Sequence, residues 1–278
     1  MDSGEEKAVE KTPEQIREEE LKRLQEFKPI HDTFARVLLR DNLPLAQDVL
    51  RTITGIRDLV LTHEETQYDL KRLAGSRSLM QDVYGGDSAG RKYNMELERS
   101  DERATPERAE YHITGMNSEH LKQGMDFSEL PETYVIFLTE EDAIGDGKAV
   151  HRFSYRDDDT NDSMGGRTHI IYANGAYEGD DEIGKLMHDF RCENADDMYN
   201  KLMAEKTRYL KDDPKGVKEM CAIMEDLRKE SEERGRYERA IEVAQNMLSK
   251  GLGSLEDIAE VTGLSIEKVR ELAGQRTA

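Results

Sequence analysis

Apolar residues recur at helical spacing in two early segments, DTFARVLLRD at 32–41 and LPLAQDVLRTITG at 43–55. Apolar side chains three and four residues apart form one stripe along a helix, so we expect two helices that pack on a core. Asp32 and Asn42 stand where N-caps are expected, and Gly55 stands where the second helix should end.

The middle of the chain has a different pattern, with short apolar or alternating segments bounded by Gly, Asp or Pro. This pattern predicts strands, since β-branched and aromatic residues favour them. GGDSAG at 85–90 is a turn signal, so the second and third strands should form a hairpin. TYVIFL at 133–138 is apolar throughout, as in a central strand covered on both faces. The six segments are DLVLTHEE (58–65), SLMQDVYG (78–85), KYNMELER (92–99), TYVIFLTEE (133–141), VHRFSYR (150–156) and THIIYANG (168–175).

Helical patterns interrupt and follow these strands. One helix is expected to begin near Pro106, and after Asp180 the chain is helical again, with a long stretch from Lys215. We therefore predict an α/β fold in which helices pack on a mixed sheet. The expected organisation is a charged N-terminal tail or loosely attached helix at 1–28, a main domain at 29–230, and a helical linker with a small module at 231–278.

The C-terminal module contains SLEDIAEVTGLSIEKVREL at 254–272, which predicts a helix, a turn at Gly263 and a second helix capped by Ser265. It is similar to a helix-turn-helix, whose second helix can enter a DNA groove. Residues 254–276 hold five acidic residues and three basic ones, whereas groove-reading helices are usually more basic. We favour a packing or oligomerisation module, with sequence-specific DNA binding as the alternative.

The formal net charge is -20, which opposes a general attraction to DNA phosphates. Contact with nucleic acid would therefore need a local site, helped by a cation. The two cysteines, Cys192 and Cys221, show neither a CxxC motif nor a histidine at metal spacing, so we interpret them as free thiols in a reducing cytosol. No apolar run reaches membrane-spanning length, so we expect a cytoplasmic protein without membrane contact.

Acidic residues gather on the second and third predicted strands. Asn94, Glu96 and Glu98 share one face of the third strand, and hairpin pairing would bring Asp82 beside Glu96. Carboxylate oxygens suit hard cations such as Mg²⁺ or Mn²⁺. The alternative is that the acidic face is simply solvated and protects a sheet edge from aggregation.

Three segments carry a resemblance to a known family. SRSLMQDVYGGDSAGRKYNMELERSDERATPERAEYH, ELPETYVIFLTEED and THIIYANGAYEGDDEIGKLMHDF follow one another as in the PD-(D/E)XK nuclease family transposases, which are related to the recombination-promoting nucleases. The likeness extends from about Lys28 to Glu230. It implies a restriction-endonuclease-like mixed sheet flanked by helices, and a metal-dependent DNA endonuclease.

The resemblance also implies residue roles. Asp82 and Glu96 would be metal ligands, together with the backbone carbonyl of Leu97. Glu98 stands where the family usually has Gln or Lys, the residue that orients or activates the attacking water. A carboxylate supplies no positive charge to the transition state, and Lys92 on the same strand is a candidate substitute.

Three further residues match family positions. Arg108 and Tyr111, one turn apart on the helix after the third strand, are candidates for phosphate binding, although an ordinary surface pair is the alternative. Asp32 is a candidate accessory residue, although a role as a helix cap would explain it equally well.

The predicted function is hydrolysis of DNA phosphodiester bonds by an endonuclease that uses Mg²⁺ or Mn²⁺. The alternative is a catalytically weakened family member that acts as a DNA- or protein-binding regulatory protein, which the exchange at Glu98 and the acidic surface favour. Nucleases of this kind often cut both strands as two copies, so a homodimer is compatible with the prediction.

Overall fold

The computed structural model describes residues 12–70, 79–98 and 104–274. All six segments predicted as strands contain strands, and Pro106 begins a helix, as expected. The elements in chain order are α1 (Pro13–Glu26), α2 (Asp32–Leu39), α3 (Leu43–Thr54), β1 (Leu61–Leu70), β2 (Leu79–Asp87), β3 (Lys92–Glu98), α4 (Pro106–His120), η2 (Phe127–Glu129), β4 (Thr133–Thr139), β5 (Val150–Phe153), β6 (Thr168–Asn174), α5 (Glu182–Arg191), η3 (Ala195–Asp197), α6 (Lys201–Asp212), α7 (Pro214–Lys250), α8 (Leu255–Thr262) and α9 (Ile266–Gly274).

The strands form one mixed sheet in the order β1-β2-β3-β4-β6-β5. β1, β2 and β3 are antiparallel neighbours, whereas β3, β4 and β6 run parallel and β5 lies antiparallel at the edge beside β6. Every residue of β4 is buried, which confirms that TYVIFL belongs to a central strand. The α/β prediction is correct, and the mixed sheet is consistent with a restriction-endonuclease-like fold.

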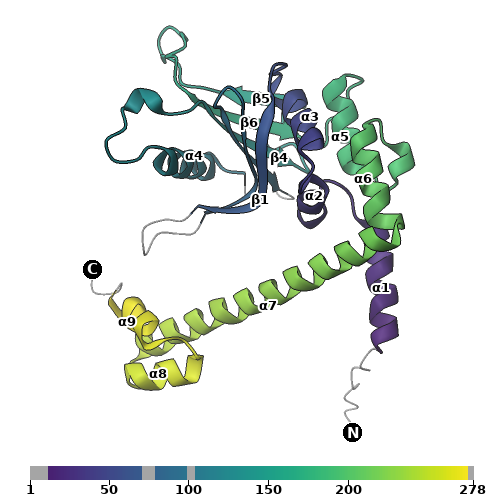
Figure 1. Cartoon of the computed structure of the whole chain (residues 1–278). Helices are drawn as coiled ribbons and strands as arrows, with labels where there is room; N and C mark the ends of the chain where they lie inside the picture. Colours follow the sequence, from purple (N-terminus) through teal and green to yellow (C-terminus); the bar gives the residue numbers. More distant parts are fainter. Residues whose placement is uncertain (1–11, 71–78, 99–103, 275–278) are drawn as a thin grey trace. The chain divides into compact units, whose positions relative to one another are not determined.

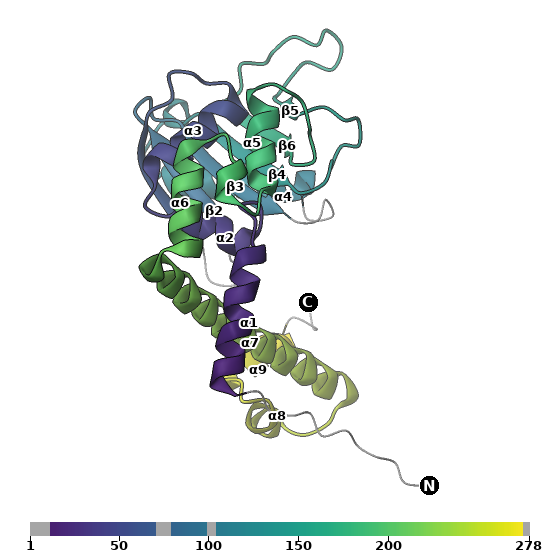
Figure 2. The same cartoon turned by 90° about the vertical axis from the view of Figure 1, so that its right-hand side faces the viewer.

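Helices cover both faces of this sheet. α4 lies on one side, and α2, α3, α5 and α6 lie on the other (Figure 1). Figure 2 is seen from the second side, with α3, α5 and α6 in front of the strands. Because strand side chains alternate between the two faces, neighbouring residues of a central strand meet different helical layers.

The predicted helix ends are mostly correct. Asn42 caps α3 through its Oδ1, which accepts a hydrogen bond from Leu45 N–H at 3.4 Å, and Gly55 ends α3 in the left-handed region at φ 76°. The cap assigned to Asp32 is wrong by one residue, because His31 is the N-cap of α2 and Asp32 is its first helical residue. An acidic residue is also favoured in the first turn of a helix, so residue type alone does not separate the two positions.

The C-terminal end of α1 is anchored to the main body. Lys211 Nζ, on α6, donates to the backbone carbonyl oxygens of Gln25 at 2.8 Å, Phe27 at 2.6 Å and Glu193 at 2.5 Å. Burial lowers the pKa of Lys211, and the three carbonyls replace the water that its ammonium group loses. The predicted N-terminal segment therefore ends in a fixed attachment at residues 24–27, where Leu24 is fully buried.

The chain divides into two compact units, Met1–Lys218 and Glu219–Ala278. In the second unit, Gly263 makes the expected turn at φ 70° and Ser265 Oγ accepts a hydrogen bond from Lys268 N–H at 3.2 Å. A small apolar core joins α8 and α9 to the end of α7 and includes Ala244, Ile258, Leu264, Val269 and Leu272. The domain boundary predicted at 230 falls inside α7.

Two predictions from composition concern thiols and membranes. Cys192 and Cys221 are both free, and each is partly buried. None of the helices within the described residues combines the length and the apolar character that crossing a membrane requires.

Candidate active site

Three polar side chains of β3 are buried between the sheet and α4. Asn94 and Glu96 are fully buried, and Glu98 is 5% exposed. They alternate with Tyr93, Met95 and Leu97, as the two-residue period of a strand predicts. The alternative of a solvated acidic face therefore does not hold for Glu96 and Glu98.

Arg108 joins the two carboxylates. Its Nη2 donates to Glu96 Oε2 at 2.7 Å, and its Nη1 donates to Glu98 Oε1. Arg108 reaches the site because Thr105 caps α4 and Pro106 begins the helix, which places residue 108 in the first turn beside the end of β3. The planar guanidinium bridges two acceptors at once, an arrangement that the single ammonium point charge of lysine does not reproduce.

His112 and Asn94 extend this network one turn along α4. Arg108 Nε lies 3.4 Å from His112 Nε2, and Asn94 Nδ2 lies 2.8 Å from His112 Nδ1. Arg108 is a donor only, so Nε2 must accept and Nδ1 must carry the proton. Asn94 Oδ1 has no hydrogen-bond partner among the described residues, and exchanging the amide O and N of Asn94 gives Nδ1–H an acceptor. The contacts thus indicate that His112 accepts at Nε2 and donates from Nδ1, which also lies 3.5 Å from Glu96 Oε1.

The surroundings of the network are apolar. The Arg108 guanidinium lies 5.8 Å from the centre of the Phe137 ring, and His112 meets the same ring edge-on. The cluster beneath α4 includes Ala109, Ile113, Val135 and Tyr172. In such surroundings an unpaired charge is costly, so the pairing of Glu96 and Glu98 with Arg108 is needed for their burial.

The donor atoms fit a hard divalent cation in their chemistry. The buried side-chain acceptors at the end of β3 include four carboxylate oxygens, and Mg²⁺ and Mn²⁺ prefer oxygen ligands. Glu96 and Glu98 together carry two negative charges against one positive charge on Arg108. The pair therefore retains an excess negative charge on a rigid central strand.

Asp82 lies in β2, directly before Val83, which pairs with Met95 of β3. The placement of the Asp82 side chain lies outside what the structure describes. Continuing the antiparallel register by one residue sets position 82 opposite Glu96. The predicted hairpin is present, and the role of Asp82 as a ligand stays a prediction.

Two other predicted site residues lie on β3. Leu97 is buried and pairs with Leu138 of β4. As the next residue after Glu96, it has its backbone carbonyl close to that glutamate. Lys92 begins the strand at the end opposite Glu98, and its Nζ lies 5.7 Å from the centre of the Tyr84 ring. The roles proposed for Leu97 and Lys92 stay predictions.

The remaining two candidates are helical. Tyr111 is partly buried and packs against the apolar cluster beneath α4, one turn after Arg108. Asp32 Oδ2 accepts a hydrogen bond from Arg36 Nη2 at 2.7 Å, one turn later in α2. Phosphate binding by Tyr111 and an accessory role for Asp32 stay predictions.

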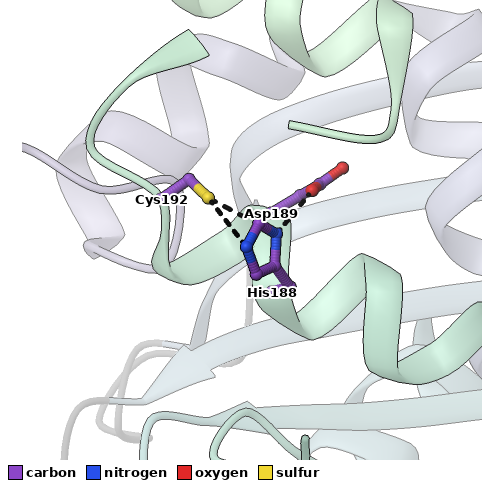
Figure 3. Close-up of side chains that lie close together, drawn as sticks. All are labelled: His188, Asp189 and Cys192. Atoms are coloured by element: carbon purple, nitrogen blue, oxygen red, sulfur yellow. Dashed lines mark hydrogen bonds and ion pairs between the residues drawn. The ribbon is translucent and has the colours of Figure 1, made fainter. Parts of the chain in front are cut away.

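The sequence reasoning missed a second group of potential ligands at the end of α5. His188 Nδ1 lies 3.2 Å from Asp189 Oδ1 and 3.5 Å from Cys192 Sγ (Figure 3). The statement that neither cysteine has a histidine at metal spacing is wrong, because His188 and Cys192 are four residues apart and meet at the end of one helix. The four-residue spacing of His188 and Cys192 was the feature of the sequence that could have identified this group.

The contacts of this group favour a structural role. Asp189 is fully buried, and its oxygens accept hydrogen bonds from Tyr199 N–H at 2.9 Å and Asn200 N–H at 2.6 Å. Burial and the carboxylate of Asp189 raise the pKa of the Cys192 thiol, which favours the neutral thiol beside this carboxylate. Asp189 therefore fixes the turn before α6.

Comparison with known proteins returns one family. The profile described as PD-(D/E)XK nuclease family transposase matches residues 47–250, which is more than half of the chain and includes β3, α4 and the network around Arg108. No curated protein matches. No solved structure matches either.

Proposed function

We propose that this chain, which belongs to the PD-(D/E)XK nuclease family transposases, is an endonuclease that hydrolyses DNA phosphodiester bonds with a divalent metal ion. The observation that carries the proposal is the burial of two glutamates on a central strand, beside an arginine that a phosphate can also bind. Membership of the family makes DNA the expected substrate.

The proposed metal ligands are Asp82, Glu96 and the carbonyl of Leu97, with Mg²⁺ or Mn²⁺ as the ion. The hairpin register supports Asp82, since a strand's two-residue period predicts that position 82 shares the face of Tyr84, which packs beneath α4. A bound ion of this kind polarises a phosphoryl oxygen and lowers the pKa of a coordinated water. The chain's own part is to hold the oxygens rigidly on two paired strands.

Glu98 and Arg108 have complementary proposed roles. Glu98, at the position of the usual Gln or Lys, accepts a proton or a hydrogen bond and so orients the attacking water. The positive charge that a lysine would supply comes instead from Arg108 on α4, which already contacts both glutamates. Tyr111 and Lys92 remain candidates for weaker phosphate contacts, and Asp32 for an accessory role.

A second function is supported by the same network. Arg108 pairs with both glutamates, so a family member could keep this ion cluster for its structure and act as a DNA- or protein-binding regulator. The net charge of -20 favours a protein partner over DNA. The small helical unit from Glu219 would serve packing or a homodimer in either case.

A plasmid-nicking assay separates the two functions. The wild type should convert supercoiled DNA to open circles with Mg²⁺ and not with EDTA, and Glu96→Ala and Asp82→Ala should each lose this activity. Glu110→Gln, an exposed change on α4, is the matched control and should behave as wild type. Nicking by Glu96→Ala at the wild-type rate would refute the assignment of the site, and DNA or protein binding without nicking would support the regulator.

A further inference from the structure

The guanidinium of Arg108 contacts carboxylate oxygens of Glu96 and Glu98 that a metal ion would also use. Arg108 Nη2 is 2.7 Å from Glu96 Oε2, and Nη1 bonds Glu98 Oε1. Mg²⁺ binds carboxylate oxygens at about 2.1 Å. An ion on Glu96 Oε2 would therefore stand less than about 5 Å from a nitrogen of the guanidinium, a repulsion that water screens only in part because the Arg108 side chain is 32% exposed.

We propose that Arg108 is an exchangeable internal counter-ion of this site. Without a divalent ion, its guanidinium offsets part of the negative charge of Glu96 and Glu98. When the ion binds, Arg108 leaves the carboxylates and becomes available to a phosphate of the substrate. This inference rests on the proposed metal-dependent function and concerns its regulation.

The two sides of the ion cluster differ in their freedom to move. Glu96 and Glu98 are fixed by a central strand, and their side chains are 0% and 6% exposed. The Arg108 side chain is 32% exposed and belongs to the first turn of α4. A cation at that end of a helix is disfavoured by the helix dipole, so α4 itself does not hold the guanidinium in place. Arg108 is thus the member that can leave.

The other contacts of Arg108, with His112 and Phe137, are weak enough for its guanidinium to move away from the carboxylates. Arg108 Nε contacts His112 Nε2 at 3.4 Å, a long contact that a water molecule can replace. The Phe137 ring, 5.8 Å from the guanidinium, remains as an apolar wall. The cost of opening is therefore concentrated in the two carboxylate contacts.

The exchange has a measurable consequence for metal affinity. An ion that binds only the open form has its apparent dissociation constant raised by the inverse of the open fraction. Two charge-assisted hydrogen bonds favour the closed form, so we expect that removing them tightens metal binding at least about tenfold, equivalent to about 1.4 kcal/mol.

The test is a Mn²⁺ titration of the full chain, with free Mn²⁺ read by electron paramagnetic resonance. The variants are Arg108→Gln, which removes the charge and the bridge, and Arg108→Lys, which keeps the charge and loses the bridge. Arg91→Gln is the matched control, because Arg91 Nε also pairs with a buried carboxylate, Asp87 Oδ2, at 2.6 Å. Arg108→Gln should bind Mn²⁺ at least about tenfold more tightly than wild type, Arg108→Lys no more tightly than Arg108→Gln, and Arg91→Gln should match wild type.

A second measurement uses the wild type alone, so it does not depend on the folding of a variant. The Nε–Hε resonance of Arg108, assigned by its loss in Arg108→Lys, should shift and exchange faster with water when Mg²⁺ is added. An unmoved resonance under saturating Mg²⁺ would overturn the inference.

The outcomes separate this inference from the function on which it rests. Equal Mn²⁺ affinity in wild type and both Arg108 variants, with binding lost in Glu96→Gln, would refute the exchange and leave the metal site intact. Tighter binding in Arg108→Gln but not in Arg108→Lys would support the exchange, because the lysine ammonium can still act as the counter-ion. No Mn²⁺ binding by any protein would refute both proposals.

Discussion

Replacing Glu96 by glutamine keeps the shape of a fully buried side chain and removes its charge. Arg108 then loses one of its two charge-assisted hydrogen bonds, the one of 2.7 Å to Glu96 Oε2. A hydrogen bond to a charged group contributes about 1.5–3 kcal/mol. The Arg108 side chain is 32% exposed, so water replaces part of the contact. We therefore expect the free energy of unfolding to fall by about 1–2 kcal/mol without metal.

The assay is thermal and urea unfolding in EDTA, followed by far-ultraviolet circular dichroism because the chain has no tryptophan. In a domain of 150–250 residues, 1 kcal/mol shifts the melting temperature by about 2–4 °C, so the expected decrease is about 2–8 °C. Glu110→Gln on the exposed side of α4 is the control and should change the melting temperature little.

The same variant also tests the metal site. A ligand present at 100 times its dissociation constant stabilises the folded state by about 2.7 kcal/mol. Mg²⁺ at that excess should raise the melting temperature of the wild type and leave Glu96→Gln unchanged. A Glu96→Gln protein as stable as wild type in EDTA would show that the contact with Arg108 does not form in solution. Equal stabilisation of both proteins by Mg²⁺ would place the ion elsewhere.

Three further predictions concern the body of the protein. Asp189→Asn should lower the free energy of unfolding by about 1–3 kcal/mol, measured in urea, because asparagine keeps one acceptor oxygen and sets an NH2 group against the other backbone N–H. Asp196→Asn, an exposed change nearby, should have little effect. Lys211→Met should free three backbone carbonyls and expose the end of α1, which limited proteolysis would detect as faster cleavage near residues 24–28. Burial raises the pKa of Glu64 from 4.5 to about 7, so folding favours its protonated form; this contribution is complete below pH 4.5 and lost as the pH rises through 7. Urea midpoints of Glu64→Gln should therefore fall less than those of wild type between pH 5 and pH 8.

The strands and most helix ends follow from local signals in the sequence. Alternation predicted which side chains of β3 share a face, and GGDSAG predicted the hairpin that brings β2 beside it. Asn42 and Gly55 were identified because an amide cap and a left-handed glycine each satisfy a specific backbone requirement. Asp32 was misplaced by one residue, since first-turn and capping positions favour the same residue type.

The network around Glu96 could not be predicted in the same way. That Glu96 and Glu98 are buried depends on the packing of α4 over β3, and neighbouring residues in the sequence do not determine this packing. The contact between Arg108 and Glu96 spans twelve residues and a change of element. The role of His112 as an acceptor follows only from the positions of Arg108 and Asn94 around its ring. Residue type identified the chemistry, and tertiary packing determined its geometry.

Stability alone does not explain why the ion cluster of Glu96, Glu98 and Arg108 is buried. Burying two carboxylates and an arginine costs desolvation that the ion pairs only partly recover, and apolar residues of similar size would serve a sheet at least as well. Glu96 and Glu98 lie on a central strand, where they alternate with apolar side chains and where Phe137 of β4 is the neighbour of Glu96. A buried acidic pair on a central strand is explained better if its negative charge has a function, such as the proposed binding of a metal ion. The positive charge beside it comes from a helix end and can move, whereas the lysine expected on the strand itself could not leave the site. Under the proposed exchange, this difference would let Arg108 offset part of the acidic charge at rest and leave the carboxylates to a metal ion.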